Sequence, residues 1–212
     1  MITLQANASY TPDSPVTLVI SNTAQEISGQ GSENEFTDYA TLNATLTERF
    51  AKITNSTDIL DIVYALYPAG ASAQHIFDTV VSDMRATCPI NRVSMAMSQS
   101  SHHNIYRLYI TNKMEGFPYY PAFHGWETFA FFDFRITEFF FPQPRDLLFA
   151  EAVKAMVKKL AWEGTVGWGA VPAAMDYGNT DDIINVLTEM PQTEVCDKLA
   201  ELDLVKYGWQ NK

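Results

Sequence analysis

The chain has 212 residues, of which 14 are lysine or arginine and 25 are aspartate or glutamate, so its formal net charge is −11. This length suits one domain or part of a larger one, and the 47% of hydrophobic residues argues against wholesale disorder. The acidic balance argues against nucleic acids and anionic membranes as partners, because both attract clustered lysine and arginine. No apolar run of about 18 residues is present, so we expect no transmembrane helix. The first 15 residues lack the basic and apolar regions of a signal peptide.

The N-terminal half is predicted to contain one strand followed by several helices. Residues 16–20 (VTLVI) are continuously apolar and rich in β-branched side chains, as expected for a strand buried on both faces in a parallel sheet. A polar loop rich in Gly, Ser and Asn follows this strand. Apolar residues at helical spacing then predict helices at residues 36–52, 58–67, 72–86 and 89–97.

The C-terminal half begins with the second clear strand pattern, residues 105–110 (IYRLYI). A loop rich in Pro and Tyr follows, and then WETFAFFDF (residues 126–134), which is expected to form a helix packed in the core. Residues 145–162 predict an amphipathic helix that begins after Pro144 and ends near Gly164. Residues 163–179 are rich in glycine and are expected to be irregular, and a last helix is predicted over 193–205.

The two predicted strands define the expected fold class. Two strands are too few for a stable sheet, and both have the pattern of central strands in a parallel sheet. We therefore expect an α/β fold of which this chain is an incomplete part, about the last third of a larger domain.

Two cysteines, Cys88 and Cys196, allow one disulfide and are too few for a zinc cluster. Asn7, Asn43 and Asn55 lie in N-x-S/T glycosylation sequons, which hint at a secretory route. We expect a secreted or extracytoplasmic protein without a cofactor or bound metal.

The candidate chemistry lies in the loops that follow the two strands. Glu26 follows the first strand and His124 follows the second, and in open α/β sheets ligands bind at the carboxyl ends of the strands. In α/β-hydrolases the triad occurs along the chain as Ser, then Asp or Glu, then His. Glu26 and His124 have the order of the last two members. The histidine would act as general base, and the carboxylate would orient it and stabilise the imidazolium.

Four segments resemble the C-terminal part of the type-B carboxylesterases, the family that includes the cholinesterases. VTLVISNTAQEISG is similar to the strand and loop with the family's catalytic acid, at Glu26, and IYRLYIT with PAFHGWETFAFF is similar to its last core strand and His-Gly-x-Glu motif, at His124. DTVVSDMRATCP, which contains Asp83, is similar to the segment before the family's next core helix, and TEVCDKLAEL is similar to its terminal helix. The resemblance covers about residues 14–206. It implies a partial α/β-hydrolase domain over residues 1–212 and a Cys88–Cys196 disulfide.

The chain departs from the family pattern in three places. Ile27 follows the acid, where the family has a small residue, and the sequence has neither a G-x-S-x-G nucleophile elbow nor a Gly-Gly oxyanion loop. The segment GASAQ (residues 70–74) has the wrong ending and lies between two predicted helices. The resemblance therefore implies a hydrolase of small-molecule carboxylic esters that is inactive alone, with its serine on a missing N-terminal segment or on another chain.

Two other interpretations remain open from the sequence. The chain could be a non-catalytic, esterase-like binding or adhesion module, since the family includes such members. It could also be an unrelated small helical protein, in which case residues 16–20 and 105–110 should be unpaired or antiparallel.

The remaining candidate residues are interpreted as structural. Glu127 is expected to be a buried or capping carboxylate, and His75 a surface or half-buried helical residue. His102 and His103 are adjacent, and adjacent residues on one strand point in opposite directions and cannot easily bind one metal ion, so we expect them to lie in a solvated turn. The aromatic residues are expected to lie mostly in the core: Trp126, Phe129, Phe131, Phe132 and residues 139–141.

Overall fold

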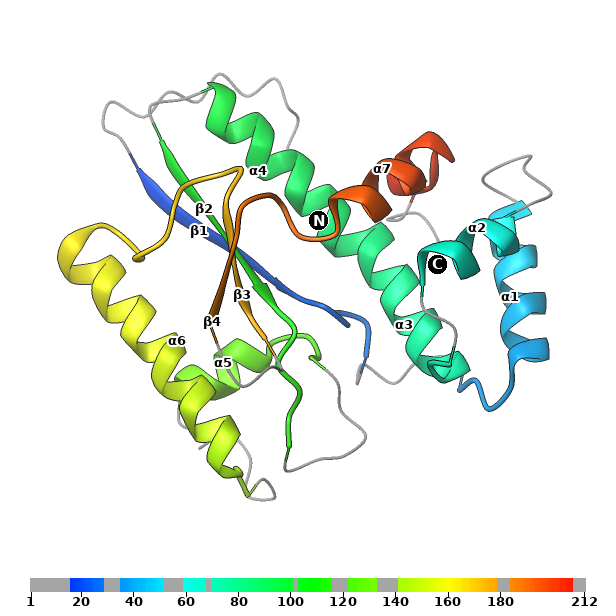
Figure 1. Ribbon diagram of the computed structural model, residues 1–212, viewed down its shortest axis with the longest axis horizontal. Coiled ribbons are helices and arrows are strands. Elements are labelled where there is room, and N and C mark those ends of the chain that lie inside the picture. Colours follow the sequence, from blue (N-terminus) through cyan, green and yellow to red (C-terminus); the bar gives the residue numbers. More distant parts are fainter. Residues whose placement is uncertain are drawn as a thin grey trace.

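The computed structural model describes residues 16–28, 35–51, 59–67, 70–100, 103–115, 122–132, 141–178 and 184–207. These residues form one four-stranded sheet with helices on both of its sides (Figure 1). The α/β class expected from the sequence is therefore confirmed.

The sheet has the order β1 (Thr17–Thr23), β2 (Asn104–Ile110), β3 (Ala174–Tyr177) and β4 (Ile184–Leu187). The first three strands run parallel, and β4 pairs antiparallel with β3. The register of β1 and β2 runs from Thr17 opposite Asn104 to Thr23 opposite Ile110. Because these two strands are parallel, their carboxyl ends lie at the same edge of the sheet.

The third and fourth strands correct the sequence analysis, which assigned residues 163–179 to irregular structure and counted only two strands. Each of these strands has only four residues, which is too short for a periodic pattern to stand out. Among the described residues β1 is an edge strand, not a central one. Because the sheet has four described strands, the expectation of an incomplete domain loses the support that it drew from a count of two strands. The parallel pairing of β1 with β2 also contradicts the third interpretation, which required them to be unpaired or antiparallel.

The helices before β2 agree with the sequence analysis except in one place. After α1 (Tyr39–Ala51) and α2 (Ile59–Leu66), the chain forms α3 (Ala73–Ser82), a π-helical turn η1 (Asp83–Thr87) and α4 (Cys88–Ser100). These last three segments follow one another without a break, whereas the sequence analysis started a new helix at Pro89. The wider turn of η1 ends at Thr87, two residues before Pro89, which has no backbone N–H to donate. The interruption of the regular hydrogen bonding therefore falls where the proline would disturb it.

The helices after β2 are α5 (Trp126–Phe131), α6 (Pro144–Glu163), α7 (Thr193–Glu201) and α8 (Leu204–Tyr207). Helix α6 begins with a capping box between Gln143 and Asp146 and ends at Gly164 in the left-handed conformation. The single last helix predicted over residues 193–205 is broken at Asp203, whose φ is 61°. No described helix has both the length and the apolar character needed to cross a membrane.

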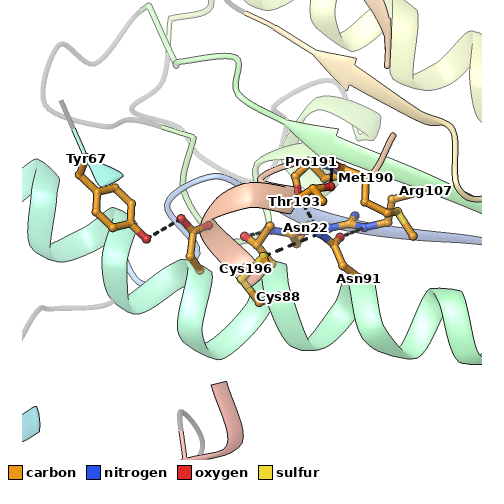
Figure 2. The surroundings of a disulfide bond; sticks show 11 residues. Asn22, Tyr67, Cys88, Asn91, Arg107, Met190, Pro191, Thr193 and Cys196 are labelled. Carbon is orange, nitrogen blue, oxygen red and sulfur yellow. Dashed lines mark hydrogen bonds between the residues drawn. A yellow bond between two sulfur atoms is a disulfide. The ribbon is translucent and has the colours of Figure 1, made fainter. Parts of the chain in front are cut away.

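The two faces of β2 pack differently because alternate residues of a strand point in opposite directions. Leu108 and Ile110 belong to an apolar core that also contains Trp126 of α5 and Phe149 of α6. Arg107 points to the other side of the sheet, where α4 lies (Figure 2). A separate apolar cluster joins α1, α2, α3, α7 and α8. The candidate site lies beyond the carboxyl ends of β1 and β2.

The aromatic residues are less buried than expected. Trp126 is fully buried and Phe129 packs against the same core. Phe131, Phe132 and Phe141 are exposed, Phe141 to 77%. Residues 139 and 140 lie outside the described part of the chain.

Candidate functional site

The loops after β1 and β2 are joined by backbone hydrogen bonds. Ala24 N–H donates to the carbonyl of Ile110, and Gln25 N–H donates to the carbonyl of Ala122, each at 2.9 Å. Gln25 and Phe123 form an isolated parallel bridge. The parallel pairing of the strands thus extends into the loops and brings the residues that follow, Glu26 and His124, side by side.

Glu26 and His124 are in direct contact. The Oε2 atom of Glu26 lies 2.5 Å from Nδ1 of His124, and its Oε1 atom accepts a hydrogen bond of 2.8 Å from the backbone N–H of Thr23. The Glu26 side chain is 15% exposed and the His124 side chain is 64% exposed. An ionised carboxylate can only accept hydrogen bonds, so the neutral ring carries its proton on Nδ1 and has a free electron pair on Nε2. This tautomer can accept a proton from a hydroxyl group that approaches from outside.

The loop that carries Glu26, called the acid loop below, is anchored on helix α3. The Gln25 side chain donates to the hydroxyl of Thr79 at 3.3 Å, and Ile27 N–H donates to the hydroxyl of Ser82 at 3.2 Å. The Ile27 side chain packs against the apolar cluster of α1, α2, α3, α7 and α8. This contact gives a physical reason for a large apolar residue directly after the acid.

His124 stands directly before Gly125, which has a φ of 79° and is the N-cap of α5. This left-handed conformation is open to glycine at low cost, and it turns the chain from the histidine loop into the helix. The backbone N–H groups of Thr128 and Phe129 both donate to the carbonyl of Gly125. This turn therefore fixes the direction of the backbone directly after His124.

Glu127 adds a second carboxyl group beside the pair. It lies half-buried in the first turn of α5, and the hydroxyl of Ser21 donates to its Oε1 atom at 3.2 Å. Burial raises the pKa of the Glu127 carboxyl, and the nearby charge of Glu26 raises it further. Its Oε2 atom has no hydrogen-bond partner among the described residues. These contacts agree with the structural interpretation of Glu127.

The disulfide implied by the resemblance is present between Cys88 and Cys196 (Figure 2). Their Cα atoms lie 5.2 Å apart, within the usual range for a disulfide. The bond joins α4 to α7 across a sequence separation of 108 residues. It lies on the helix that packs behind β1 and β2, not at the Glu26–His124 pair.

A buried polar group that was not among the residues predicted from the sequence lies next to the disulfide. Arg107 of β2 is fully buried and hydrogen-bonds to Asn22 of β1 and Asn91 of α4. The available signal was an arginine in the middle of the otherwise apolar strand IYRLYI. Its partners could not be identified, because a strand pattern does not show which distant residues face it.

The other candidate residues have structural positions. Ser72 of the GASAQ segment is the N-cap of α3, where its hydroxyl accepts the N–H of His75 at 3.2 Å, so it is not on a nucleophile elbow. His103 precedes β2 and its Nδ1 atom accepts the N–H of Val16, while residue 102 lies outside the described part of the chain. Of the three sequons, only Asn43 is described, and it lies in α1. In the described ranges, no group of three or more His, Cys, Asp or Glu residues is placed to hold a metal ion.

No protein-family model matches the chain, and comparison with curated proteins found no significant match. The family resemblance and the roles that it implies for Glu26 and His124 therefore stay predictions.

Proposed function

We propose that this chain carries the acid and the histidine of a serine carboxylic-ester hydrolase of the type-B carboxylesterase class, within an α/β-hydrolase fold. The observation that carries this proposal is the 2.5 Å contact between Glu26 and His124, made at the carboxyl ends of two neighbouring parallel strands. Active sites of open α/β sheets lie at this end of the strands.

Each residue of the pair would have a defined role in acyl transfer. His124 would accept the proton of a serine hydroxyl at Nε2 as the oxygen attacks the ester carbonyl, and would then give this proton to the departing alcohol. A water molecule would repeat the sequence and release the acid from the acyl-enzyme. Glu26 would hold the Nδ1 proton, fix the tautomer and stabilise the imidazolium that forms in both steps.

The serine and the oxyanion hole would come from outside these 212 residues, on a further segment or another chain. Three observations support this. The sequence has no G-x-S-x-G motif, no hydroxyl or thiol of the described residues hydrogen-bonds to the His124 ring, and the ring is largely exposed. Among the described strands, β1 also has a partner on one side only, so its other edge can accept a further strand.

The substrate would be a small-molecule carboxylic ester. The disulfide favours secretion or another oxidising compartment.

The test uses p-nitrophenyl acetate and two preparations of the protein. The first is the 212-residue chain alone. The second is the material that co-purifies with the tagged chain from the organism that makes it. Both are compared as wild type and as His124→Gln, with His75→Gln in α3 as the matched control. We expect hydrolysis by the native material to fall by about a thousandfold or more in His124→Gln, the scale seen when a triad member is removed. The native material with His75→Gln should retain the activity. For the chain alone, the rate of ester hydrolysis should be the same in the wild type and in His124→Gln.

Two outcomes would overturn parts of this proposal. His124-dependent turnover by the chain alone would refute the separate nucleophile. Native material whose turnover does not depend on His124 would refute the esterase role and favour the alternative, a non-catalytic esterase-like binding or adhesion module.

A further inference from the structure

Arg107 is a buried charge that the proposed reaction does not use. It lies on β2 with no exposed surface and points away from the apolar core of α5 and α6. Taking a guanidinium out of water is strongly unfavourable unless its hydrogen bonds are replaced. A cation in this position therefore needs a specific set of acceptors, and these acceptors indicate what it holds together.

Its acceptors come from three elements, and Figure 2 shows two of them, Asn22 and Asn91. On β1 the guanidinium donates to the carbonyl of Ile20 at 3.0 Å and to the side-chain oxygen of Asn22. On α4 its Nε atom donates to the side-chain oxygen of Asn91 at 3.0 Å. On its own strand it donates to the carbonyl of Leu108 at 2.5 Å. These hydrogen-bond acceptors are all neutral, so the planar fork of an arginine fixes geometry here instead of forming an ion pair.

Asn22 connects this buried group to the acid loop. Its side-chain NH₂ group donates to the carbonyl of Thr23 at 2.8 Å and to the hydroxyl of Thr87 at 3.1 Å. The N–H of Thr23 in turn donates to Oε1 of Glu26 at 2.8 Å. A continuous path of hydrogen bonds thus leads from Arg107 through Asn22 and Thr23 to one oxygen of the Glu26 carboxylate. The other oxygen of this carboxylate contacts Nδ1 of His124.

Electrostatics also links Arg107 to the acid loop. Burial lowers the pKa of Arg107 to about 10, while the nearby Tyr109 and Glu26 raise it. Glu26 therefore lies close enough to Arg107 for the two side chains to interact through their charges.

We propose that Arg107 is a positioning residue for the Glu26–His124 pair, acting through Asn22 and Thr23 on the carboxylate of Glu26. This inference rests on the proposed function. The groups that maintain the contact between Glu26 and His124 then include a buried cation on the side of the sheet that α4 covers.

The test is an NMR measurement of how fast the Nδ1 proton of His124 exchanges with water, made on the 212-residue chain at low temperature. The resonance is assigned by its loss in His124→Gln and in Glu26→Gln. We expect exchange to be about tenfold faster or more in Arg107→Met, the factor that follows from losing a hydrogen bond to a charged group. Arg107→Lys keeps the positive charge but lacks the planar guanidinium, so its exchange rate should lie between those of the wild type and Arg107→Met.

Two further variants separate positioning from general destabilisation. Asn22→Ala removes the connection while leaving the other acceptors of Arg107 in place, so it keeps the proposal testable if Arg107→Met does not fold. Leu108→Ala removes a buried side chain of the same strand on its opposite face and is the control. Folding of each variant is checked by circular dichroism and by the oxidised state of the two cysteines.

The outcomes distinguish the two proposals. Faster exchange in Asn22→Ala and in folded Arg107→Met, with wild-type exchange in Leu108→Ala, supports the inference. Wild-type exchange in Asn22→Ala, or equal acceleration in Leu108→Ala, overturns the inference and leaves the proposed function standing. If the wild type has no such resonance, or Glu26→Gln does not change it, the contact is absent and both proposals fall.

Discussion

Replacing Asp83 with asparagine should make the stability of the protein less dependent on pH. Asp83 lies in η1 and has no exposed surface, and the hydroxyl of Tyr67 donates to its Oδ2 atom at 3.0 Å (Figure 2). Burial raises the pKa of its carboxyl group from 3.8 to about 7, although hydrogen bonds from Thr87 and Tyr67 oppose this shift. The folded protein therefore keeps the proton up to near neutral pH, whereas the unfolded chain releases it near pH 4.

The sign and size of the effect follow from proton linkage. Between these two pKa values the folded state binds more protons than the unfolded state, so the free energy of unfolding falls as the pH rises. A shift of roughly three pKa units corresponds to about 4 kcal/mol, lost progressively and fully lost above the folded pKa. Asparagine does not ionise and can still accept the hydrogen bond of Tyr67. Asp83→Asn should therefore gain stability relative to wild type from pH 4 to pH 8, by up to about 4 kcal/mol.

The assay is urea unfolding at several pH values between 4 and 8, followed by tryptophan fluorescence. Asp61→Asn, at an exposed position of α2, is the matched control and should follow the wild type at every pH. If the free energies of Asp83→Asn and wild type differ by the same amount at pH 4 and pH 8, the burial argument for Asp83 is refuted.

Two further predictions concern stability and the site. Replacing Cys88 and Cys196 with alanine opens a loop with a sequence separation of 108 residues and should lower the free energy of unfolding by about 4–5 kcal/mol in the chain-entropy model, measured by urea unfolding against the oxidised wild type; an unchanged midpoint would contradict this. Gly125→Ala, at a φ of 79°, should cost about 1–2 kcal/mol and also speed the exchange of the His124 Nδ1 proton. Gly164→Ala, at a φ of 67°, should cost a similar amount without changing that exchange, and equal effects on the proton would show that Gly125 has no special role.

The strands that carry the site could be predicted because each forms a compact apolar run. Residues 16–20 and 105–110 stand out from the polar segments around them, and a parallel arrangement places the residues that follow them together. The proximity of positions 26 and 124 was therefore accessible from the sequence.

The short strands β3 and β4 were not accessible in this way. The segments AMDY and INVL have four residues each, and their strand conformation depends on pairing with β2 and with each other. Local propensity is a weak guide where tertiary contacts decide the conformation.

The role of Arg107 was also out of reach, for a different reason. Its acceptor Asn22 is 85 positions away and its acceptor Asn91 is 16 positions away. A strand pattern indicates that position 107 is buried, but only the packing of α4 behind the sheet determines which groups satisfy its guanidinium. A buried arginine in an apolar strand is a useful signal that such partners exist.

The most direct test of the central claim is labelling with a fluorophosphonate, which reacts with activated serines, followed by mass spectrometry of the modified peptide. The material that co-purifies with the tagged chain from its source organism is used, as wild type and as His124→Gln. We predict that the label lies on a serine outside these 212 residues and that His124→Gln greatly reduces its rate of attachment. A label on a serine within this chain, labelling that does not depend on His124, or no labelled serine at all would contradict the account.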